Sequence, residues 1–418
     1  MKFFKNLFNS LFNSSKKARI IKETVKGDYE NISELMAAAK QGNADAQNRL
    51  GNCYAVGEDV EESHDKAAEW WLKAAKQGVA SAQCNIASYL CAAANHAKSA
   101  EEKNRVLKEA AEFYKASAEQ GNMYAQFYLG GCYHDGAGIR QSHEKSIEWY
   151  RKSAEQGYEP AQFKLGMCHY LGHGTKQSYE KAAVWFRKAA EKGHVDAQEG
   201  IGICYYNGRG VKQSYAEAAK WYRKAAEAGH AGAQKKIGDC YDLGRGVQKS
   251  DAEAFKWWLK AAGQGDVDAQ VLVGRYYDMG KGTTKSATKA FEWMLKAAEQ
   301  GDAEAQYNTG VYYITGKGTT KSLQKAIEWW EAAAEQGDAE AQFSLGELLL
   351  CNMDKGNRQM EGYEWLQAAA EQGHDGAREM LEEVNKILIA NRKSRTGNSV
   401  ANPVFDTFLG FCHTITAN

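Results

Sequence analysis

Proline and net charge are both scarce in this chain. Only 2 of its 418 residues are proline, and 53 Lys and Arg are matched by 53 Asp and Glu. This balance argues against a nucleic-acid partner, because such proteins carry an excess of basic residues to neutralise phosphates. A mean hydropathy of −0.62 is too polar for a membrane-spanning protein, and 44% hydrophobic residues rule out bulk disorder. The length allows two to four domains or one long repeat array.

A regular period decides between those two possibilities. Ala-Gln pairs recur every 36 residues, except for one gap of 43, and a glycine precedes each pair by about four residues. The pairs begin at Ala46, Ala82, Ala125, Ala161, Ala197, Ala233, Ala269, Ala305 and Ala341. Self-similarity at this period predicts stacked supersecondary units, each of which needs its neighbours to bury its apolar face.

Each unit has the sequence of a helical hairpin. Residues 302–315 begin with a capping aspartate and place apolar side chains at helical spacing, which predicts a first helix, helix A. Gly316 and Gly318 then provide a stop signal. Ser322 precedes a run of strong helix formers that ends at Gly337, which predicts helix B. In two units the serine has a glutamate three residues later, the spacing of a reciprocal capping box: Ser214 with Glu217, and Ser250 with Glu253.

All 11 tryptophans fall in helix B. Eight share one column, eight residues before the closing glycine, and Trp71, Trp258 and Trp330 lie one position later. An aromatic stripe at this spacing predicts a core between neighbouring units rather than a cofactor site.

The unit pattern closely resembles the Sel-like repeat, a relative of the tetratricopeptide repeat. The resemblance is clearest in residues 197–210, AQEGIGICYYNGRG, and 215–229, YAEAAKWYRKAAEAG, and it covers about residues 30–385. It implies an all-α fold, an α/α right-handed superhelical solenoid of stacked helix-turn-helix repeats. It also implies an adaptor or scaffold role without shared catalytic residues.

We therefore expect nine hairpins within a solenoid at residues 29–391, with a half unit at 30–41 and a closing helix at 377–391. The second unit is seven residues longer and replaces the Gly-x-Gly loop with residues 91–98, which predicts extended helices around a different turn. Residues 1–28 form a separate basic segment, amphipathic or disordered, and residues 392–418 are expected to be a flexible tail.

Comparison of the units with one another identifies a face of helix A whose residues change freely. Its opposite face keeps nearly the same chemistry in most units and so builds the stack. We predict that the variable face binds a protein or peptide on the concave helix A surface. The candidate residues are Phe127, His134, Phe163, Met167, Tyr170, Ile203, Tyr206, Asp239, Asp242, Arg275, Asp278 and Tyr307. Packing against adjacent units is the alternative for Phe127, Phe163, Tyr307 and also Phe343.

No enzyme activity, cofactor or metal is expected. The 9 cysteines are an odd number, and five share one helix A column where stacked helices are too far apart for disulfides. Buried thiols in a reducing compartment are the prediction, with a disulfide framework as the alternative. His169 and His173, with Cys168 beside them and Cys132 and His134 near, suggest a metal site only weakly, because the spacing lacks an H-E-x-x-H glutamate. A cysteine-rich Sel-like hydrolase or metal-binding protein remains the competing class.

The two ends of the chain are basic. Residues 1–28 carry seven Lys and Arg and two acids, and residues 386–418 carry four and one, so the middle is about −8 by difference. Residues 1–12, MKFFKNLFNSLF, place their apolar side chains on one helical face and lack a signal-peptide core and cleavage site. We expect a cytoplasmic protein. For this segment three readings stay open: membrane-surface contact through residues 1–18, docking onto the array, and disorder.

Overall fold

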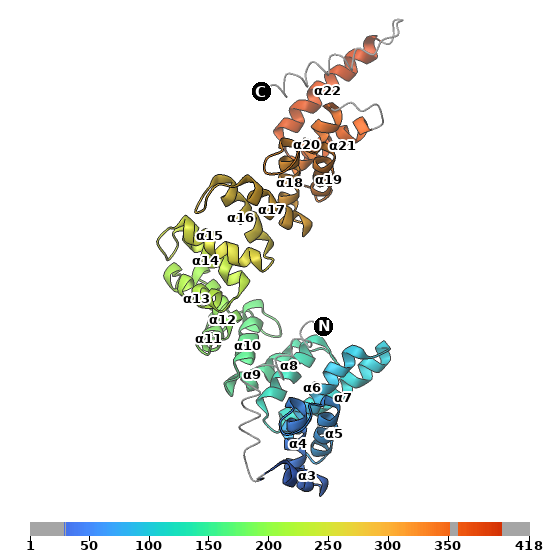
Figure 1. Cartoon of the computed structure of the whole chain (residues 1–418), viewed down its shortest axis with the longest axis vertical. Coiled ribbons are helices and arrows are strands. Elements are labelled where there is room, and N and C mark those ends of the chain that lie inside the picture. The colour runs from blue at the N-terminus through green and yellow to red at the C-terminus, as the bar shows by residue number, and fades with distance from the viewer. Residues whose placement is uncertain (1–28, 30, 352–357, 395–418) are drawn as a thin grey trace. The chain divides into compact units, whose positions relative to one another are not determined.

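The computed structural model describes residues 29, 31–351 and 358–394. Within these residues it contains 20 α-helices, α3 to α22, and no strands. The predicted all-α repeat solenoid is confirmed, because consecutive helices pack as pairs (Figure 1). The proposed N-terminal amphipathic segment and most of the predicted tail lie outside the described residues.

Nine helices occupy the position of helix A, and most of them contain 13 residues. They are α4 (Ala44–Val56), α6 (Ala80–Ala93), α8 (Met123–Asp135), α10 (Glu159–Leu171), α12 (Val195–Asn207), α14 (Ala231–Leu243), α16 (Val267–Met279), α18 (Ala303–Thr315) and α20 (Ala339–Cys351).

Nine further helices occupy the position of helix B. They are α5 (His64–Lys76), α7 (Ala100–Glu119), α9 (His143–Glu155), α11 (Tyr179–Glu191), α13 (Tyr215–Glu227), α15 (Asp251–Gly263), α17 (Ala287–Glu299), α19 (Leu323–Glu335) and α21 (Arg358–Glu371). The predicted half unit is α3 (Ile32–Lys40), and the predicted closing helix is α22 (Asp375–Ser394). The second repeat has the expected extension: α7 contains 20 residues and follows a short 3-10 turn, Ala94–His96.

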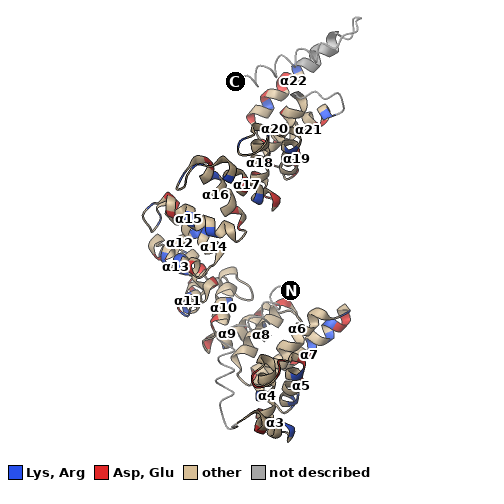
Figure 2. Ribbon diagram, viewed as in Figure 1, with Lys and Arg blue, Asp and Glu red and all other residues tan. Residues whose placement is uncertain are grey.

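The described helices form two compact units, which divide between Lys224 and Ala225. Within each unit, helix A packs against its own helix B and against the helix B before it. Acidic and basic segments are interspersed over the helices of both units (Figure 2).

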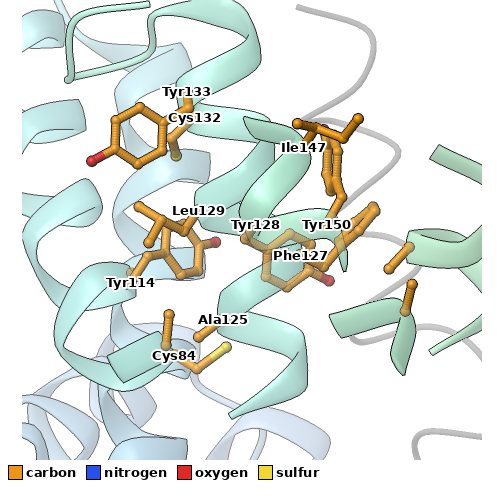
Figure 3. Packing of buried hydrophobic residues seen from close by; sticks show 14 of the residues in the cluster. Cys84, Tyr114, Ala125, Phe127, Tyr128, Leu129, Cys132, Tyr133, Ile147 and Tyr150 are labelled. Atoms are coloured by element: carbon orange, nitrogen blue, oxygen red, sulfur yellow. The ribbon is translucent and has the colours of Figure 1, made fainter. Parts of the chain in front are cut away.

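The most deeply buried aromatic side chains of helix B lie one position after the column of eight tryptophans. Trp71, Tyr114, Phe186 and Trp258 are at most 1% exposed, and the aromatic side chains of the third repeat converge between α8 and its neighbours (Figure 3). Most of the eight aligned tryptophans are only half-buried at the edge of this core, although Trp221 and Trp257 are buried. A lysine three residues later covers six of these rings, as Lys152 does over Trp149 at 3.8 Å. The sequence therefore located the aromatic layer but not its deepest column.

Candidate functional site

Three side chains near the end of helix A form the surface that varies between repeats. They lie six, nine and ten residues after the alanine of the Ala-Gln pair, and we call the surface that they form the variable surface. In the fourth and fifth repeats, which belong to the first unit, this surface consists of Met167, Tyr170, Leu171, Ile203, Tyr206 and Asn207. In the second unit, the corresponding residues of the sixth and seventh repeats are Asp239, Asp242, Leu243, Arg275, Asp278 and Met279.

Apolar and aromatic side chains dominate this surface in the fourth and fifth repeats. Met167 and Tyr170 are half-buried against the core, whereas Leu171 is 49% exposed. The Tyr170 ring lies 5.1 Å from that of Tyr179, and the same arrangement recurs one repeat later between Tyr206 and Tyr215. Ile203 is half-buried. These contacts hold the rings in place while leaving part of each available at the surface.

Charged residues replace the aromatics in the second unit, and each has a partner. Asp239 accepts a hydrogen bond of 3.0 Å from Trp258 Nε1, and burial raises the pKa of its carboxyl. Asp242 and Asp278 accept from lysines of the next loop, and Arg275 pairs with Glu304. These four side chains therefore contribute to contacts within and between repeats as well as to the surface.

The four aromatic candidates closest to the start of helix A pack against neighbouring elements. Phe127 is 4% exposed, in contact with Tyr128 and Tyr150. Phe163 stacks on His194 at 4.8 Å between ring centroids, and Phe343 stacks on His374 at 4.5 Å. Tyr307 stacks on Trp330 at 6.4 Å. The packing alternative accounts for the contacts of all four, and Phe127 contributes almost no exposed surface.

Comparison with known proteins identifies the repeat. The Sel1 repeat matches the chain nine times, over residues 44–79, 80–122, 124–158, 159–194, 195–230, 231–266, 267–302, 303–338 and 339–374. The chain belongs to the Sel1 repeat family. These matches agree with the nine pairs from α4–α5 to α20–α21.

Two solved structures support this assignment. The c5321 protective antigen of uropathogenic Escherichia coli, which displays the same repeat fold, is 32% identical with a TM-score of 0.74; the match covers 87% of this chain and 76% of that one. A Sel1 repeat protein from Oxalobacter formigenes is 30% identical with a TM-score of 0.59, covering 79% and 93%. No curated protein matches the sequence significantly.

Successive Sel1 repeats are joined by a contact that the sequence analysis missed. In each such contact, the residue between the two loop glycines of one repeat contacts a variable-surface residue of the repeat before it. That residue lies nine positions after the alanine of its Ala-Gln pair and 39 residues earlier in the chain. Arg209 Nη1 donates to Tyr170 Oη at 2.6 Å, Lys281 Nζ donates to Asp242 at 2.8 Å, and Lys317 Nζ lies 2.7 Å from Asp278. We call these contacts the loop clasps. A basic residue recurring 39 residues after a tyrosine or aspartate was the available signal.

The histidine and cysteines considered from sequence as a metal arrangement lie in the buried core. His169 is 4% exposed and occupies the core tyrosine column, where burial lowers its pKa. The seven cysteines whose side chains the structure describes are buried and form no disulfide with one another. Burial raises the pKa of Cys168 and Cys204 to about 11, which keeps these thiols protonated.

Among the residues that the structure describes, no group of three or more His, Cys, Asp or Glu side chains could hold a metal ion. No helix in this part of the chain has both the length and the apolar character to cross a membrane.

Proposed function

We propose that this Sel1 repeat protein is a non-catalytic scaffold that binds a protein or peptide on the variable surface. Proteins of this repeat class typically mediate protein–protein interactions. The observation that carries the proposal is the contrast between columns: the repeated core positions hold the stack together, while the variable surface changes from aromatic to charged residues along the chain. Because the fold does not require those changes, selection for a partner is the simplest explanation.

Partly exposed apolar side chains favour a partner that brings apolar groups of its own. Leu171 is 49% exposed in the first unit, and Leu243 and Met279 are 53% and 61% exposed in the second. Tyr170 and Tyr206 add aromatic rings of the kind that anchor protein interfaces. The proposed partner therefore presents apolar side chains at a repeat-like spacing, and the loop clasps supply polar contacts at the rim.

We place this binding in the cytoplasm. Seven buried thiols that form no disulfide with one another fit a reducing compartment, where disulfides rarely form.

Site-specific photo-crosslinking tests the proposal. A photo-reactive phenylalanine analogue is placed at Leu171 or Ile203 on helix A, and at Val184 on helix B as the control. Val184 belongs to the same repeat as Leu171 and is 53% exposed, so access to solvent is matched. We expect the two helix A positions to capture the same protein in cells that make this chain, and Val184 not to capture it. Capture from Val184 alone, or equally from all three positions, would refute the assignment.

A further inference from the structure

The loop clasp between the fourth and fifth repeats carries an exposed positive charge at the variable surface. Arg209 lies between the loop glycines that follow α12, and its side chain is exposed. Its Nη1 donates to the Tyr170 hydroxyl at 2.6 Å. Its Cζ lies 5.8 Å from the ring centroid of Tyr170 and 5.3 Å from that of Tyr179. Counting every residue that the structure describes, no Asp or Glu side chain forms an ion pair with Arg209.

The two loop clasps of the second unit differ in this respect. Lys281 Nζ lies 2.8 Å from a carboxylate oxygen of Asp242 and 3.5 Å from one of Asp251. Lys317 Nζ lies 2.7 Å from a carboxylate oxygen of Asp278. In both cases the repeat before the lysine supplies the negative charge that neutralises it. The clasp of the first unit ends on a neutral hydroxyl instead, so its cation stays available to a carboxylate from another molecule.

The two tyrosines hold this guanidinium in place before any partner binds. Arginine stacks on aromatic rings and presents five N–H donors in a rigid plane. Only one of its nitrogens, Nη1, donates to another side chain among the described residues. Two N–H groups of one guanidinium can bind both oxygens of a carboxylate. Because the side chain is already ordered, a complex would lose less rotamer entropy than one formed by a free arginine.

We propose that the partner of the variable surface carries an Asp or Glu side chain that forms an ion pair with Arg209, beside an apolar side chain that packs on Leu171. This inference rests on the proposed protein-binding function and names the chemistry of its partner. Leu171 directly follows Tyr170 in α10 and is 49% exposed, so an apolar contact adjoins the charge. A single guanidinium matches a single carboxylate. A phosphorylated side chain carries nearly two negative charges and is usually bound by a cluster of basic residues.

Short random peptides displayed on phage provide the probe for the full chain. Peptides are retained only if they bind the wild-type chain and lose binding to the Leu171→Lys/Ile203→Lys variant, which limits them to the variable surface. We expect the retained peptides to be enriched in Asp or Glu next to an apolar residue.

A double-mutant cycle then measures the ion pair. Retained peptides are synthesised with the acid and with the matching amide, Gln for Glu or Asn for Asp, and their dissociation constants are measured by fluorescence anisotropy. Arg209→Gln should weaken binding of the acidic peptide at least about fivefold and leave the amide peptide nearly unaffected. Lys317→Gln is the matched control, because Lys317 holds the same loop position but is already paired with Asp278; affinity should not change.

A charge exchange covers the case in which Arg209→Gln disturbs the loop. Arg209→Glu should bind a peptide with Lys in place of the acid more tightly than it binds the acidic peptide, and circular dichroism verifies that each variant is folded. Equal losses for the acidic and amide peptides, or retained peptides without an excess of acids, would overturn the ion pair and leave the proposed function intact. Tenfold tighter binding of a phosphoserine peptide would overturn the carboxylate assignment. If no peptide depends on Leu171 and Ile203, the proposed function is contradicted, and this inference with it.

Discussion

Single glycines set how closely the loop of one repeat approaches the helix B before it. Gly210, the second loop glycine, has a φ of +72°, and a Cβ there would lie against the backbone carbonyl of Tyr179. Gly138, Gly174, Gly282 and Gly318 make the same approach at other joints. From the sequence, these glycines were interpreted as stop signals. Their close approach was not predictable, because the atoms they meet belong to the preceding repeat.

Gly210→Ala should therefore destabilise the array more than a glycine change that affects only backbone conformation. Gly193→Ala is the matched control, because Gly193 also has a positive φ, +92°, but no atom lies within 4 Å of its would-be Cβ. We expect the control to lose about 1–2 kcal/mol of stability, because alanine is strained at a positive φ. Gly210→Ala should lose about 1–3 kcal/mol more, because its Cβ also clashes. Thermal unfolding followed by circular dichroism measures both. Equal losses would contradict the close approach.

One loop clasp makes stability depend on pH. Burial alone would raise the pKa of Asp242, but hydrogen bonds from Lys281 and Tyr276 outweigh burial and hold that pKa below its ordinary value. A carboxyl whose folded-state pKa is depressed contributes stability above its unfolded-state pKa, and it loses that contribution as the pH falls through the folded-state value.

Asp242→Asn should accordingly lower stability by about 1 kcal/mol at neutral pH. The difference from wild type should shrink as the pH falls below about 4 and the wild-type carboxyl takes up a proton. Thermal unfolding of both proteins across this pH range checks the prediction. If the stability difference between the two proteins stays constant or grows in acid, the ionised Asp242 carboxylate is not the cause of that difference.

At the scale of elements, a buried glutamine links each helix A to the helix B before it. Gln126 Nε2 donates to the Ala118 carbonyl, and its Oε1 accepts a hydrogen bond of 2.8 Å from Gln156, the residue after α9. The same pair joins Gln47 to Gln77 and Gln270 to Gln300. The recurring Ala-Gln pairs identified this glutamine column in the sequence. The second glutamine of each pair, 30 residues later, is recognised as its partner only in the structure.

The fourth repeat lacks that partner. Gln162 Oε1 is buried without a hydrogen bond because Lys192 stands where glutamine recurs, and its Nζ donates to the Gly157 carbonyl instead. In the first and third repeats one amide makes both contacts, as Gln156 does with Gly121 and Gln126. Lys192→Gln should therefore raise stability by about 0.5–1.5 kcal/mol. Lys176→Gln, in an exposed loop, controls for the lost charge; an equal gain there would remove this explanation.

Helix starts show both a success and a failure of sequence reasoning. Ser214 and Ser250 do cap α13 and α15, since Ser214 Oγ accepts from the Glu217 amide and Ser250 Oγ from that of Glu253. The reciprocal half of the predicted capping box is wrong. The amides of both serines donate to the carbonyls of Tyr205 and Tyr241 instead, at 3.0 Å. Those acceptors lie nine residues back, across a loop, and local spacing could not reveal them.

On the scale of the whole molecule, periodicity predicted the parts that depend on neighbouring residues in the chain. The nine pairs, the half unit and the closing helix were all predicted, because helix-forming runs and glycine stops are local signals. The loop clasps were not, because they join residues 39 positions apart whose types differ between repeats. Fold and surface thus depend on different columns of the same repeat.

The affinity of the partner captured by crosslinking tests this division of roles most directly. Its dissociation constant is measured for the wild-type chain, for a Leu171→Lys/Ile203→Lys variant of the variable surface, and for Val184→Lys on helix B. We predict at least about tenfold weaker binding for the double variant, about 1.4 kcal/mol or more, with Val184→Lys unchanged and helicity preserved in all three. Unchanged affinity in the double variant, or a loss confined to Val184→Lys, would contradict the account.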